Sequence, residues 1–290
     1  MNESLTPKFS IIIPSFNRAA SVGRTIESLL DQTDSNWEII LVDDGSTDHT
    51  KILIEKYLSD PRIHYYFKKN EGVSLARNYG SNYSTGDFLI FLDSDDQLER
   101  EALENFSKLI FANPNSKIIQ AGFTLLDDDL IIKSVVIPKS NTYTPFLSGN
   151  FVIRRDFFQS IGGYDSQLNF AENTELFHRI KLANSDVVLG DFISLRYLDQ
   201  PLGGSKNLRN SSRSIAYILD KHDLSLPLAT KNLYWQIIGV NHLRFREFGS
   251  ARTMFRKALK YKLFQPKALI RLSLACFPFV SKMVYKQSIH

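Results

Sequence analysis

The sequence predicts an α/β protein, with a mostly parallel, Rossmann-like sheet covered by helices on both faces and a helical C-terminal extension. Short apolar runs alternate with segments whose apolar residues recur at helical spacing, which is typical of βαβ units. The runs are apolar at nearly every position, so both faces of the sheet should be covered. In such sheets, ligands bind beyond the carboxyl ends of the strands.

The first 125 residues contain five expected strands, and helical patterns separate them. The strands are expected at 9–13, 37–42, 63–67, 88–92 and 117–123. The helices are expected at roughly 19–32, 48–58, 73–84 and 99–112. This order predicts parallel strands joined by crossover helices.

The second half of the chain is less regular. A hairpin strand is expected at 130–137, then a loop, a strand, a short helix and a Gly-Gly turn within 146–165, a helix at 174–185 and a polar, Gly-rich loop at 199–212. Further helical patterns cover roughly 212–222, 228–240, 243–262 and 265–286. We therefore expect a main domain over residues 1–211 and a helical, basic extension over residues 212–290.

Composition and charge exclude several classes of protein. Hydrophobic residues at 43% and charged residues at 23% are typical of a globular chain, and a single cysteine excludes a disulfide framework. Neither a leader sequence nor a run of 18 apolar residues is present, so we expect a cytoplasmic protein without a spanning helix. Residues 243–290 carry a surplus of ten positive charges, and the remainder has six more acids than basic residues. This layout argues against nucleic acid as a partner and suits contact with an anionic membrane surface at one end.

Three of the predicted strands end in polar sequences that should meet at one rim of the sheet. These are "PSFN" at 14–17, "DDGSTD" at 43–48 and "DSDD" at 93–96. Asp93 and Asp95 are candidate ligands for Mn²⁺ or Mg²⁺, which are often held by one or two carboxylates together with substrate phosphates. The alternative is a solvated turn in which Asp95 or Asp96 caps a helix.

Two further residues of the rim are candidates for binding a ligand. Asp43 directly follows a strand, where its carboxylate can accept hydrogen bonds from a base or a ribose; the alternative is a turn that leads into a helix capped by Ser46 or Asp48. Arg77 lies on an Ala-rich predicted helix, and its alternative is an ordinary surface arginine.

The motifs "IIIPSFNR", "EIILVDDGSTD", "NEGVSLARNYG", "GDFLIFLDSDD" and "IGGYD" occur in this order and resemble the family 2 glycosyltransferases of the GT-A fold over roughly residues 8–200. The resemblance implies that a sugar is transferred from a nucleoside diphosphate sugar with inversion at the anomeric carbon. It implies a nucleotide site formed by Pro14, Phe16, Asp43, Arg77 and Asp93. It implies that Asp95, with Asp93, binds the metal. It also implies a sugar and acceptor pocket formed by Gly149, Asn150, Gly163, Tyr164 and Asp165.

The chain departs from the family pattern at the acceptor side. The family's general base is an Asp, and in "AENTELFHRI" (171–180) its position falls on Asn173, whose amide cannot act as a base. Glu172 and Glu175 flank it and are the candidate bases, although both could be solvated glutamates at the start of a helix. Arg179 is not part of a Gln-x-x-Arg-Trp pattern, so a single-addition enzyme is expected.

The expected partners are a UDP-linked donor and a saccharide or lipid-linked acceptor used in the synthesis of cell-surface polysaccharide. The alternatives are a sugar-nucleotide-binding protein without catalysis and a sugar nucleotidyltransferase, although the segment after the first strand has only Gly23 for a triphosphate loop. No G-x-G-x-x-G follows that strand, which argues against a dinucleotide dehydrogenase.

The basic tail at 248–282 is either a packed helical pair, with Met254, Phe255, Leu259 and Leu263 as its core, or a cationic surface for a membrane.

Overall fold

The computed structural model describes residues 7–199, 207–261 and 265–288, which form two compact units. The sheet unit contains residues 7–168 and 172–199, and the helical unit contains the remaining described residues. The boundary expected between residues 211 and 212 falls inside helix α7 (Leu208–Lys221). The helix begins earlier because the side chain of Asn207 accepts a hydrogen bond from the backbone N–H of Asn210 (2.9 Å) and caps it.

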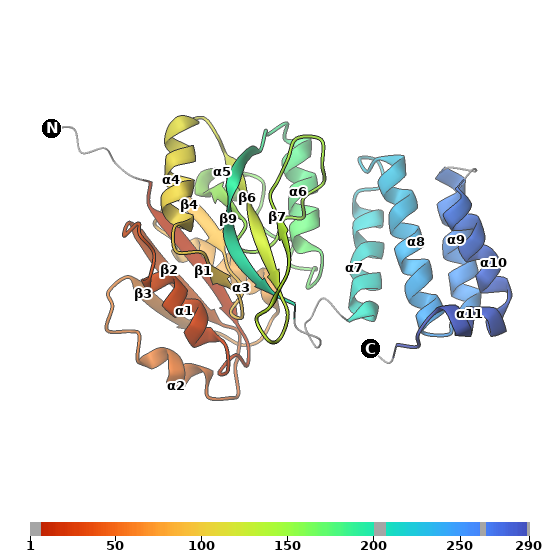
Figure 1. The fold of residues 1–290 in the computed structure, drawn as a ribbon, viewed down its shortest axis with the longest axis horizontal. Helices are drawn as coiled ribbons and strands as arrows, with labels where there is room; N and C mark the ends of the chain where they lie inside the picture. The colour runs from red at the N-terminus through yellow and green to blue at the C-terminus, as the bar shows by residue number, and fades with distance from the viewer. Residues whose placement is uncertain (1–6, 200–206, 262–264, 289–290) are drawn as a thin grey trace. The chain divides into compact units, whose positions relative to one another are not determined.

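The sheet unit is built on one mixed sheet, drawn in Figure 1. Its strands are β1 (Phe9–Ser15), β2 (Trp37–Asp43), β3 (Ile63–Phe67), β4 (Phe88–Phe91), β5 (Gln97–Leu98), β6 (Ile118–Leu126), β7 (Ile132–Val136), β8 (Phe151–Arg154) and β9 (Val188–Leu198). They lie in the order β3-β2-β1-β4-β8-β6-β9-β5, and β7 pairs with β6. Strands β1 to β4 are parallel, as expected, whereas β8 is antiparallel to both β4 and β6.

Helices cover both faces of this sheet, as the apolar runs predicted. Its helices are α1 (Val22–Leu30), α2 (Thr50–Glu55), α3 (Val73–Tyr83), α4 (Ala102–Ala112), α5 (Arg155–Ser160) and α6 (Glu172–Leu182). Successive strand residues point to opposite faces. Ile11 and Ile13 pack in one core with α1 and α4, and Ile12 packs in a second core with α3, α5 and α6.

The expected strands and helices of the first 125 residues and the hairpin strand are confirmed, with small shifts at their ends. The eleven-residue strand β9 and the short strand β5 were not anticipated. Strand β9 has no clean alternation of buried and exposed residues, and its pairing with β6 shifts register twice, so it carries no simple period. Half of the loop expected at 199–212, residues 200–206, lies outside the described residues, and the end of this loop belongs to α7.

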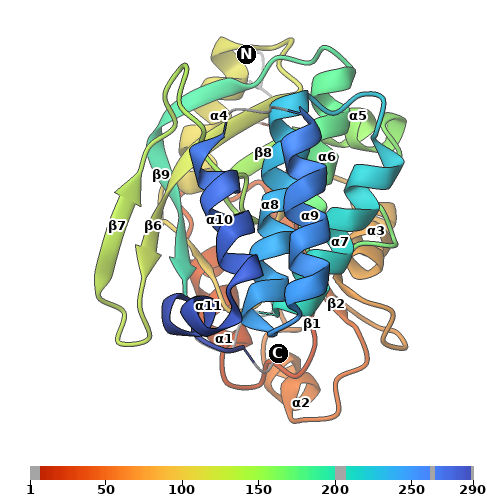
Figure 2. The same cartoon turned by 90° about the vertical axis from the view of Figure 1, so that its right-hand side faces the viewer.

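The helical unit consists of α7, α8 (Leu228–Arg244), α9 (Phe248–Tyr261), α10 (Pro266–Cys276) and α11 (Pro278–Val284). Helices α7 to α10 pack in chain order, α7 on α8, α8 on α9 and α9 on α10, and Figure 2 shows them running alongside one another. The helix expected over 265–286 is divided in two because Pro278 cannot continue α10. None of the described helices is long and apolar enough to cross a membrane.

The core of the helical unit centres on Phe255, a predicted core residue that is fully buried. Its ring packs where Gly239 of α8 leaves room, since a Cβ there would lie 2.6 Å from the ring. The other predicted core residues differ: Met254 and Leu259 are only half-buried, and Leu263 lies outside the described residues.

We expect Gly80→Ala to destabilise the sheet unit. A Cβ at Gly80 would lie 2.6 Å from Cγ2 of Ile12, so α3 would have to move away from β1. Alanine gains about 1 kcal/mol of helix propensity over glycine, whereas overpacking a core costs about 1–3 kcal/mol. Urea unfolding should therefore show a lower free energy of unfolding, while the exposed-site control Asn82→Ala should change little; a Gly80→Ala protein as stable as the wild type would contradict this packing.

Glu38 makes the stability of the sheet unit depend on pH. Burial alone would raise the pKa of its carboxyl, but hydrogen bonds from Ser10, Thr85 and Lys8 outweigh burial and lower that pKa. A lowered pKa in the folded state stabilises the fold above the unfolded value of about 4.3, and this stability is lost as the pH falls through the folded pKa.

Glu38→Gln should accordingly lower the free energy of unfolding by about 1.5–3 kcal/mol at neutral pH, the contribution of hydrogen bonds to a charged group. The difference from the wild type should shrink as the pH falls below about 4. Denaturant unfolding at a series of pH values measures both effects. A difference that stays constant across this range would show that the charge of Glu38 does not stabilise the fold.

Candidate functional site

The loops that follow β1 and β2 are hydrogen-bonded to each other at the carboxyl ends of these strands. Asn17 has a left-handed backbone (φ 53°), its Oδ1 accepts from Thr47 N (2.8 Å), and its own N–H donates to Ser46 Oγ (2.9 Å). The predicted base-binding residues of the first loop differ in exposure, because Pro14 is buried within β1 whereas Phe16 is 45% exposed. Phe16 is therefore the one that presents an open apolar surface.

Asp43 lies at the rim as predicted, but its carboxylate is fully buried. Oδ1 accepts from the N–H of Ser46 (2.7 Å), and Oδ2 accepts from the hydroxyl of Tyr65 (2.8 Å). Burial and this hydrogen bond raise the pKa of the Tyr65 hydroxyl, so Tyr65 stays a donor. In this structure Asp43 braces its own loop, and its contact with a base remains a prediction.

The next residue, Asp44, was not singled out from the sequence, yet it organises the loop before α3. Its carboxylate accepts from Lys68 Nζ (2.7 Å) and from the N–H groups of Glu71 (3.0 Å) and Gly72 (2.8 Å). Asp44 thus fixes the start of the helix that carries Arg77. The two adjacent aspartates of "DDGS" could have indicated two different structural roles, because consecutive side chains at a strand end point to opposite sides.

Arg77 connects three segments of the site. Its guanidinium, only 2% exposed, donates to Asp93 Oδ1 (2.6 Å), Glu172 Oε1 (2.8 Å) and Ser148 Oγ (2.8 Å). It also lies 5.2 Å from the centre of the Tyr164 ring. Burial would lower the pKa of the guanidinium, but the charges of Asp93 and Glu172 outweigh this and raise it. The structure excludes the alternative of an ordinary surface arginine.

The "DSDD" segment concentrates carboxylates of different exposure. Asp93 is 36% exposed at its side chain, Asp95 is 17% exposed and lies 3.6 Å from Arg18, and Asp96 is almost fully buried. Burial and then the charge of Asp93 raise the pKa of the Asp95 carboxyl, and burial with both neighbouring charges raises the pKa of Asp96 well above its ordinary value. Burial and the neighbouring carboxylates thus both disfavour the charged forms of Asp95 and Asp96.

The alternative reading of this segment as a helix cap is wrong. The next helix, α4, begins only at Ala102, after strand β5. Asp96 instead accepts a hydrogen bond from the N–H of Leu198 at the end of β9 (2.9 Å). Across the described ranges, no group of three or more His, Cys, Asp or Glu side chains is arranged to hold a metal ion. The carboxylates predicted to hold a metal at the rim, Asp93 and Asp95, stay a prediction.

In the "SGN" segment, the two predicted pocket residues, Gly149 and Asn150, stabilise the conformation of their own loop. Asn150 is fully buried, and its amide bonds to Leu147 N (2.9 Å) and Pro145 O (3.0 Å) of its own loop. Gly149 has a φ of 98°, and a Cβ would meet Leu195 Cδ1 at 2.6 Å, so only glycine fits there. Ser148, which the sequence reading did not select, is the residue of this segment that contacts Arg77.

The "GGYD" turn supports the start of α6. Gly163 has a left-handed backbone (φ 65°), and its carbonyl accepts from Arg179 (2.6 Å). Tyr164 is 2% exposed, and its hydroxyl donates to Asn173 Oδ1 (2.7 Å). Asp165 accepts from the N–H of Gln167 (2.9 Å) within the same turn. Of the predicted pocket residues, Tyr164 is therefore the one that contacts both Arg77 and α6.

The two candidate bases have different surroundings. Glu175 is fully buried and binds Arg179 through both carboxylate oxygens, at 2.7–3.0 Å. The side chain of Glu172 is 14% exposed, and only its Oε1 is engaged, by Arg77. Among the described residues none donates a hydrogen bond to its Oε2. Glu172 is thus the better placed of the two to accept a proton, and Glu175 is an ion-pair partner.

A family model described as Glycosyl transferase family 2 matches residues 10–144. The putative teichuronic acid biosynthesis glycosyltransferase TuaG of Bacillus subtilis is 35% identical over 151 residues, which is 50% of this chain and 59% of that protein. The Escherichia coli glucosyltransferase WfgD is 33% identical over 139 residues, which is 48% of this chain and 54% of that protein. The chain spans less than two thirds of the length of these curated relatives.

Among solved structures, S. aureus TarS 1-349 in complex with UDP-GlcNAc superimposes with a TM-score of 0.65 at 18% identity. The match covers 96% of this chain and 88% of that chain. Identity this low supports the fold alone, and the match agrees with the mixed sheet described above. Residues 10–144 are therefore similar to the family 2 glycosyltransferases, and the structure has the GT-A fold.

Proposed function

We propose that this protein is an inverting glycosyltransferase that transfers a sugar from a nucleoside diphosphate sugar, UDP-linked, to a saccharide or lipid-linked saccharide acceptor in cell-surface polysaccharide synthesis. The observation that carries the proposal is the buried guanidinium of Arg77, which joins Asp93 at the end of β4 to Glu172 at the start of α6. TarS structures carry UDP-GlcNAc and UDP, and WfgD is named for UDP-Glc and a diphosphoundecaprenol-linked acceptor, which supports the choice of donor and acceptor classes.

The reaction needs charge stabilisation on one side of the sugar and a base on the other. Cleavage of the anomeric C–O bond leaves a diphosphate with added negative charge, and the acceptor hydroxyl attacks from the opposite face while it loses its proton. We assign the proton to Oε2 of Glu172, because Arg77 holds the other oxygen and fixes the orientation of the carboxylate. Tyr164 and Asn173 support the helix start from which Glu172 projects.

Mn²⁺ or Mg²⁺ is the proposed cofactor, with Asp95 and Asp93 as its protein ligands. The proposed ligands fit a hard divalent cation, because both are carboxylates, and a cation would relieve the repulsion from Asp93 that adds to burial in raising the pKa of Asp95. Two protein carboxylates are enough when substrate phosphates complete the coordination. When bound, the metal would act as a Lewis acid on the leaving diphosphate.

A second candidate function is sugar-nucleotide binding without catalysis. Asn173 favours it, because an amide occupies the position of the family's carboxylate base and is already bonded to Tyr164. A thermal-shift screen of UDP, GDP and dTDP with and without Mn²⁺, followed by transfer assays with UDP-sugars and a panel of acceptors, separates the two. Binding with measurable transfer supports the enzyme; binding without transfer or donor hydrolysis supports the second candidate.

Asp95→Asn should abolish Mn²⁺-dependent binding of the nucleotide and leave the fold intact. Because the pKa of Asp95 is raised in the folded protein, its charge opposes folding at neutral pH, so the ligand-free variant should melt no lower than the wild type. Thermal shift with UDP and Mn²⁺ measures both effects, and the exposed Asp128→Asn is the matched control. An Asp95→Asn protein that keeps its metal-dependent affinity would refute the assignment of this ligand.

The two glutamates of α6 should fail in different ways. Glu172→Gln should lower kcat by about 10²–10⁴-fold, the usual contribution of a general base, with donor affinity nearly unchanged. Glu175→Gln should instead lower stability, because Arg179 would keep its charge without a paired carboxylate, a loss of about 3–5 kcal/mol for a buried pair.

Steady-state kinetics and denaturant unfolding of both variants measure this separation, and Asn173→Ala should reduce kcat far less than Glu172→Gln does. Full kcat in the Glu172→Gln enzyme would move the base to another group. A larger loss for Asn173→Ala than for Glu172→Gln would show that Asn173 positions the acceptor.

A further inference from the structure

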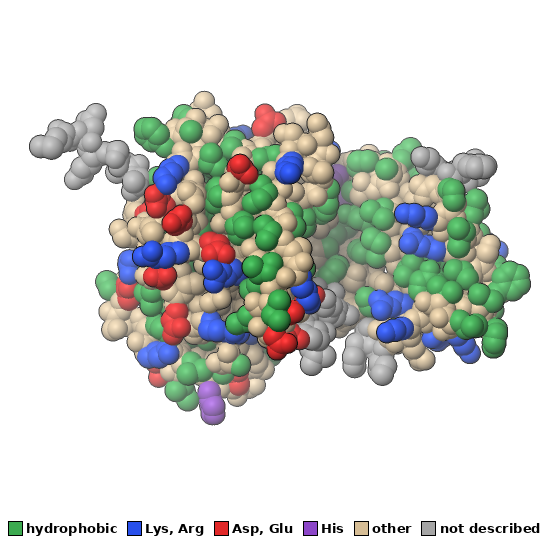
Figure 3. Space-filling view, in the orientation of Figure 1, with side chains coloured by type: hydrophobic (Ala, Val, Ile, Leu, Met, Phe, Trp, Pro, Cys, Tyr) green, Lys and Arg blue, Asp and Glu red, His purple; other side chains and the backbone are tan. Residues whose placement is uncertain are grey.

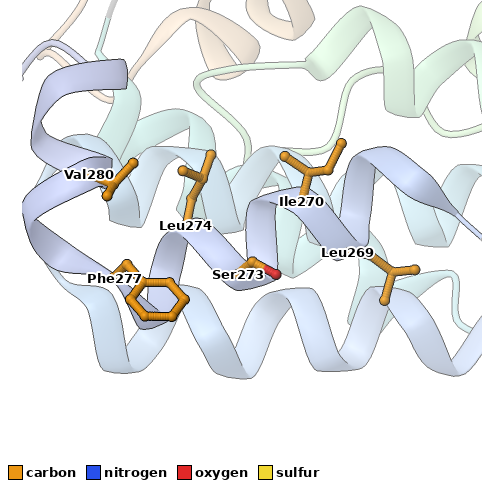
Figure 4. Close-up of a pocket in the computed structure, with 6 residues that line it drawn as sticks. All are labelled: Leu269, Ile270, Ser273, Leu274, Phe277 and Val280. Carbon is orange, nitrogen blue, oxygen red and sulfur yellow. The ribbon is translucent and has the colours of Figure 1, made fainter.

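The last two helices of the helical unit, α10 and α11, carry large apolar side chains that are exposed to solvent. We define the α10–α11 face as the apolar side chains that α10 and α11 present to solvent: Leu269, Ile270, Leu274, Phe277, Phe279, Val280, Met283 and Val284. Phe277, Phe279 and Met283 are exposed by 63%, 79% and 77%. Six residues of the two helices line a hollow of about 300 Å³ there (Figure 4).

Helical periodicity explains why this face is exposed. Ala268 and Ala275 lie seven residues apart on the opposite side of α10 and are fully buried, Ala275 in the core around Phe255. The small alanines therefore pack inward while the large apolar residues point outward. Single exposed apolar residues are common on proteins, but a contiguous group of large ones marks a binding surface.

The charges around this face are of one sign. From Phe248 to the C-terminus the sequence contains nine Lys or Arg residues and no Asp or Glu. Lys267, Lys282 and Lys286 are exposed on or beside α10 and α11. On the side of the helical unit visible in Figure 3, Lys and Arg side chains lie beside hydrophobic ones.

We propose that the α10–α11 face binds the surface of an anionic lipid bilayer. Its aromatic and aliphatic side chains enter the boundary between headgroups and acyl chains, and its lysines lie against the lipid phosphates. Helices of 11 and seven residues are too short to span a bilayer core of about 30 Å, so they lie in the plane of its surface. The proposal stands on the helical unit alone and does not depend on catalysis.

Charge favours a bilayer over a second copy of the chain as the occupant. Pairing two α10–α11 faces would bring two strongly basic segments together without a single acid from residues 248–290 to neutralise them. An anionic lipid surface supplies both the apolar phase and the opposite charge. Added salt should therefore weaken the initial attraction, since exposed charges are screened within about 10 Å at 0.1 M.

The single cysteine provides a direct reporter. Cys276 is exposed at the end of α10, directly before Phe277, so an environment-sensitive fluorophore attached to its thiol lies beside the face. The full-length protein is mixed with vesicles of equal parts phosphatidylglycerol and phosphatidylcholine, and with vesicles of phosphatidylcholine alone. We expect a blue shift and cosedimentation with the anionic vesicles only. Unlabelled protein, measured by cosedimentation, controls for an effect of the label.

Two sets of substitutions test the two contributions separately. Replacing Lys267, Lys282 and Lys286 by Gln should weaken binding to the anionic vesicles by roughly 100-fold, since each lysine near such a surface contributes about 1 kcal/mol. Replacing Phe277, Phe279 and Met283 by Ser should abolish the blue shift. The matched controls are Leu224→Ser, an exposed apolar residue outside the face, and the exposed lysines of the sheet unit, Lys51, Lys139 and Lys181, changed together to Gln.

These outcomes decide the proposal. Equal binding to neutral and anionic vesicles, no binding to either, or binding that survives both sets of substitutions would overturn it. A dimer in analytical ultracentrifugation that the Ser substitutions dissociate would also overturn it, because the face would then join two copies. Unchanged melting temperatures of the variants exclude unfolding as the cause of lost binding, and an inactive enzyme that still binds anionic vesicles would leave the proposal supported.

Discussion

The site depends on one buried cation. The Arg77 guanidinium is 2% exposed and is stabilised there by two carboxylates and a hydroxyl from three separate segments of the chain. Breaking a buried ion pair by removing one partner costs about 3–5 kcal/mol, so these three segments cannot separate freely. Arg77 thereby couples the segment that would bind the donor to the helix that would carry the base, and it gives both a common geometry before any ligand arrives.

The residues around Arg77 divide the work of binding and of bracing. Asp44 and Asn150 are hydrogen-bonded to backbone groups of neighbouring loops. Asp43, also at the rim, is buried and accepts a hydrogen bond from the Tyr65 hydroxyl. Among the predicted nucleotide-binding residues, the side chains that remain accessible are Phe16 and Asp93. Polar residues at strand ends are thus not all ligands: backbone N–H groups of tight loops need acceptors, and buried aspartates and asparagines supply them.

The sequence predicts the sheet and the rim well because apolar periodicity and strand-end polarity are local signals. It places Asp43 and Asp93 at one edge, the family resemblance adds Arg77 nearby, and in the structure Arg77 contacts Asp93. It does not reveal which carboxylates are buried, since burial depends on contacts between distant segments. Glu172 and Glu175 look alike in sequence, yet Glu172 pairs with Arg77, 95 residues away, whereas Glu175 pairs with Arg179, four residues away. Strand β9 is not predicted from the sequence for the same reason, because its conformation depends on its pairing with the distant strand β6.

The amide at position 173 is consistent with the charge balance around Arg77. One guanidinium already faces the carboxylates of Asp93 and Glu172, and Asp95 and Asp96 lie close to the first of these. A carboxylate at position 173 would add another negative charge beside Glu172, where the available cation is already shared. An amide accepts the same hydrogen bond from the Tyr164 hydroxyl without that charge. The substitution therefore keeps the support of the helix start while it leaves Glu172 as the carboxylate next to the guanidinium, which is the arrangement expected if the role of the base has moved by one residue.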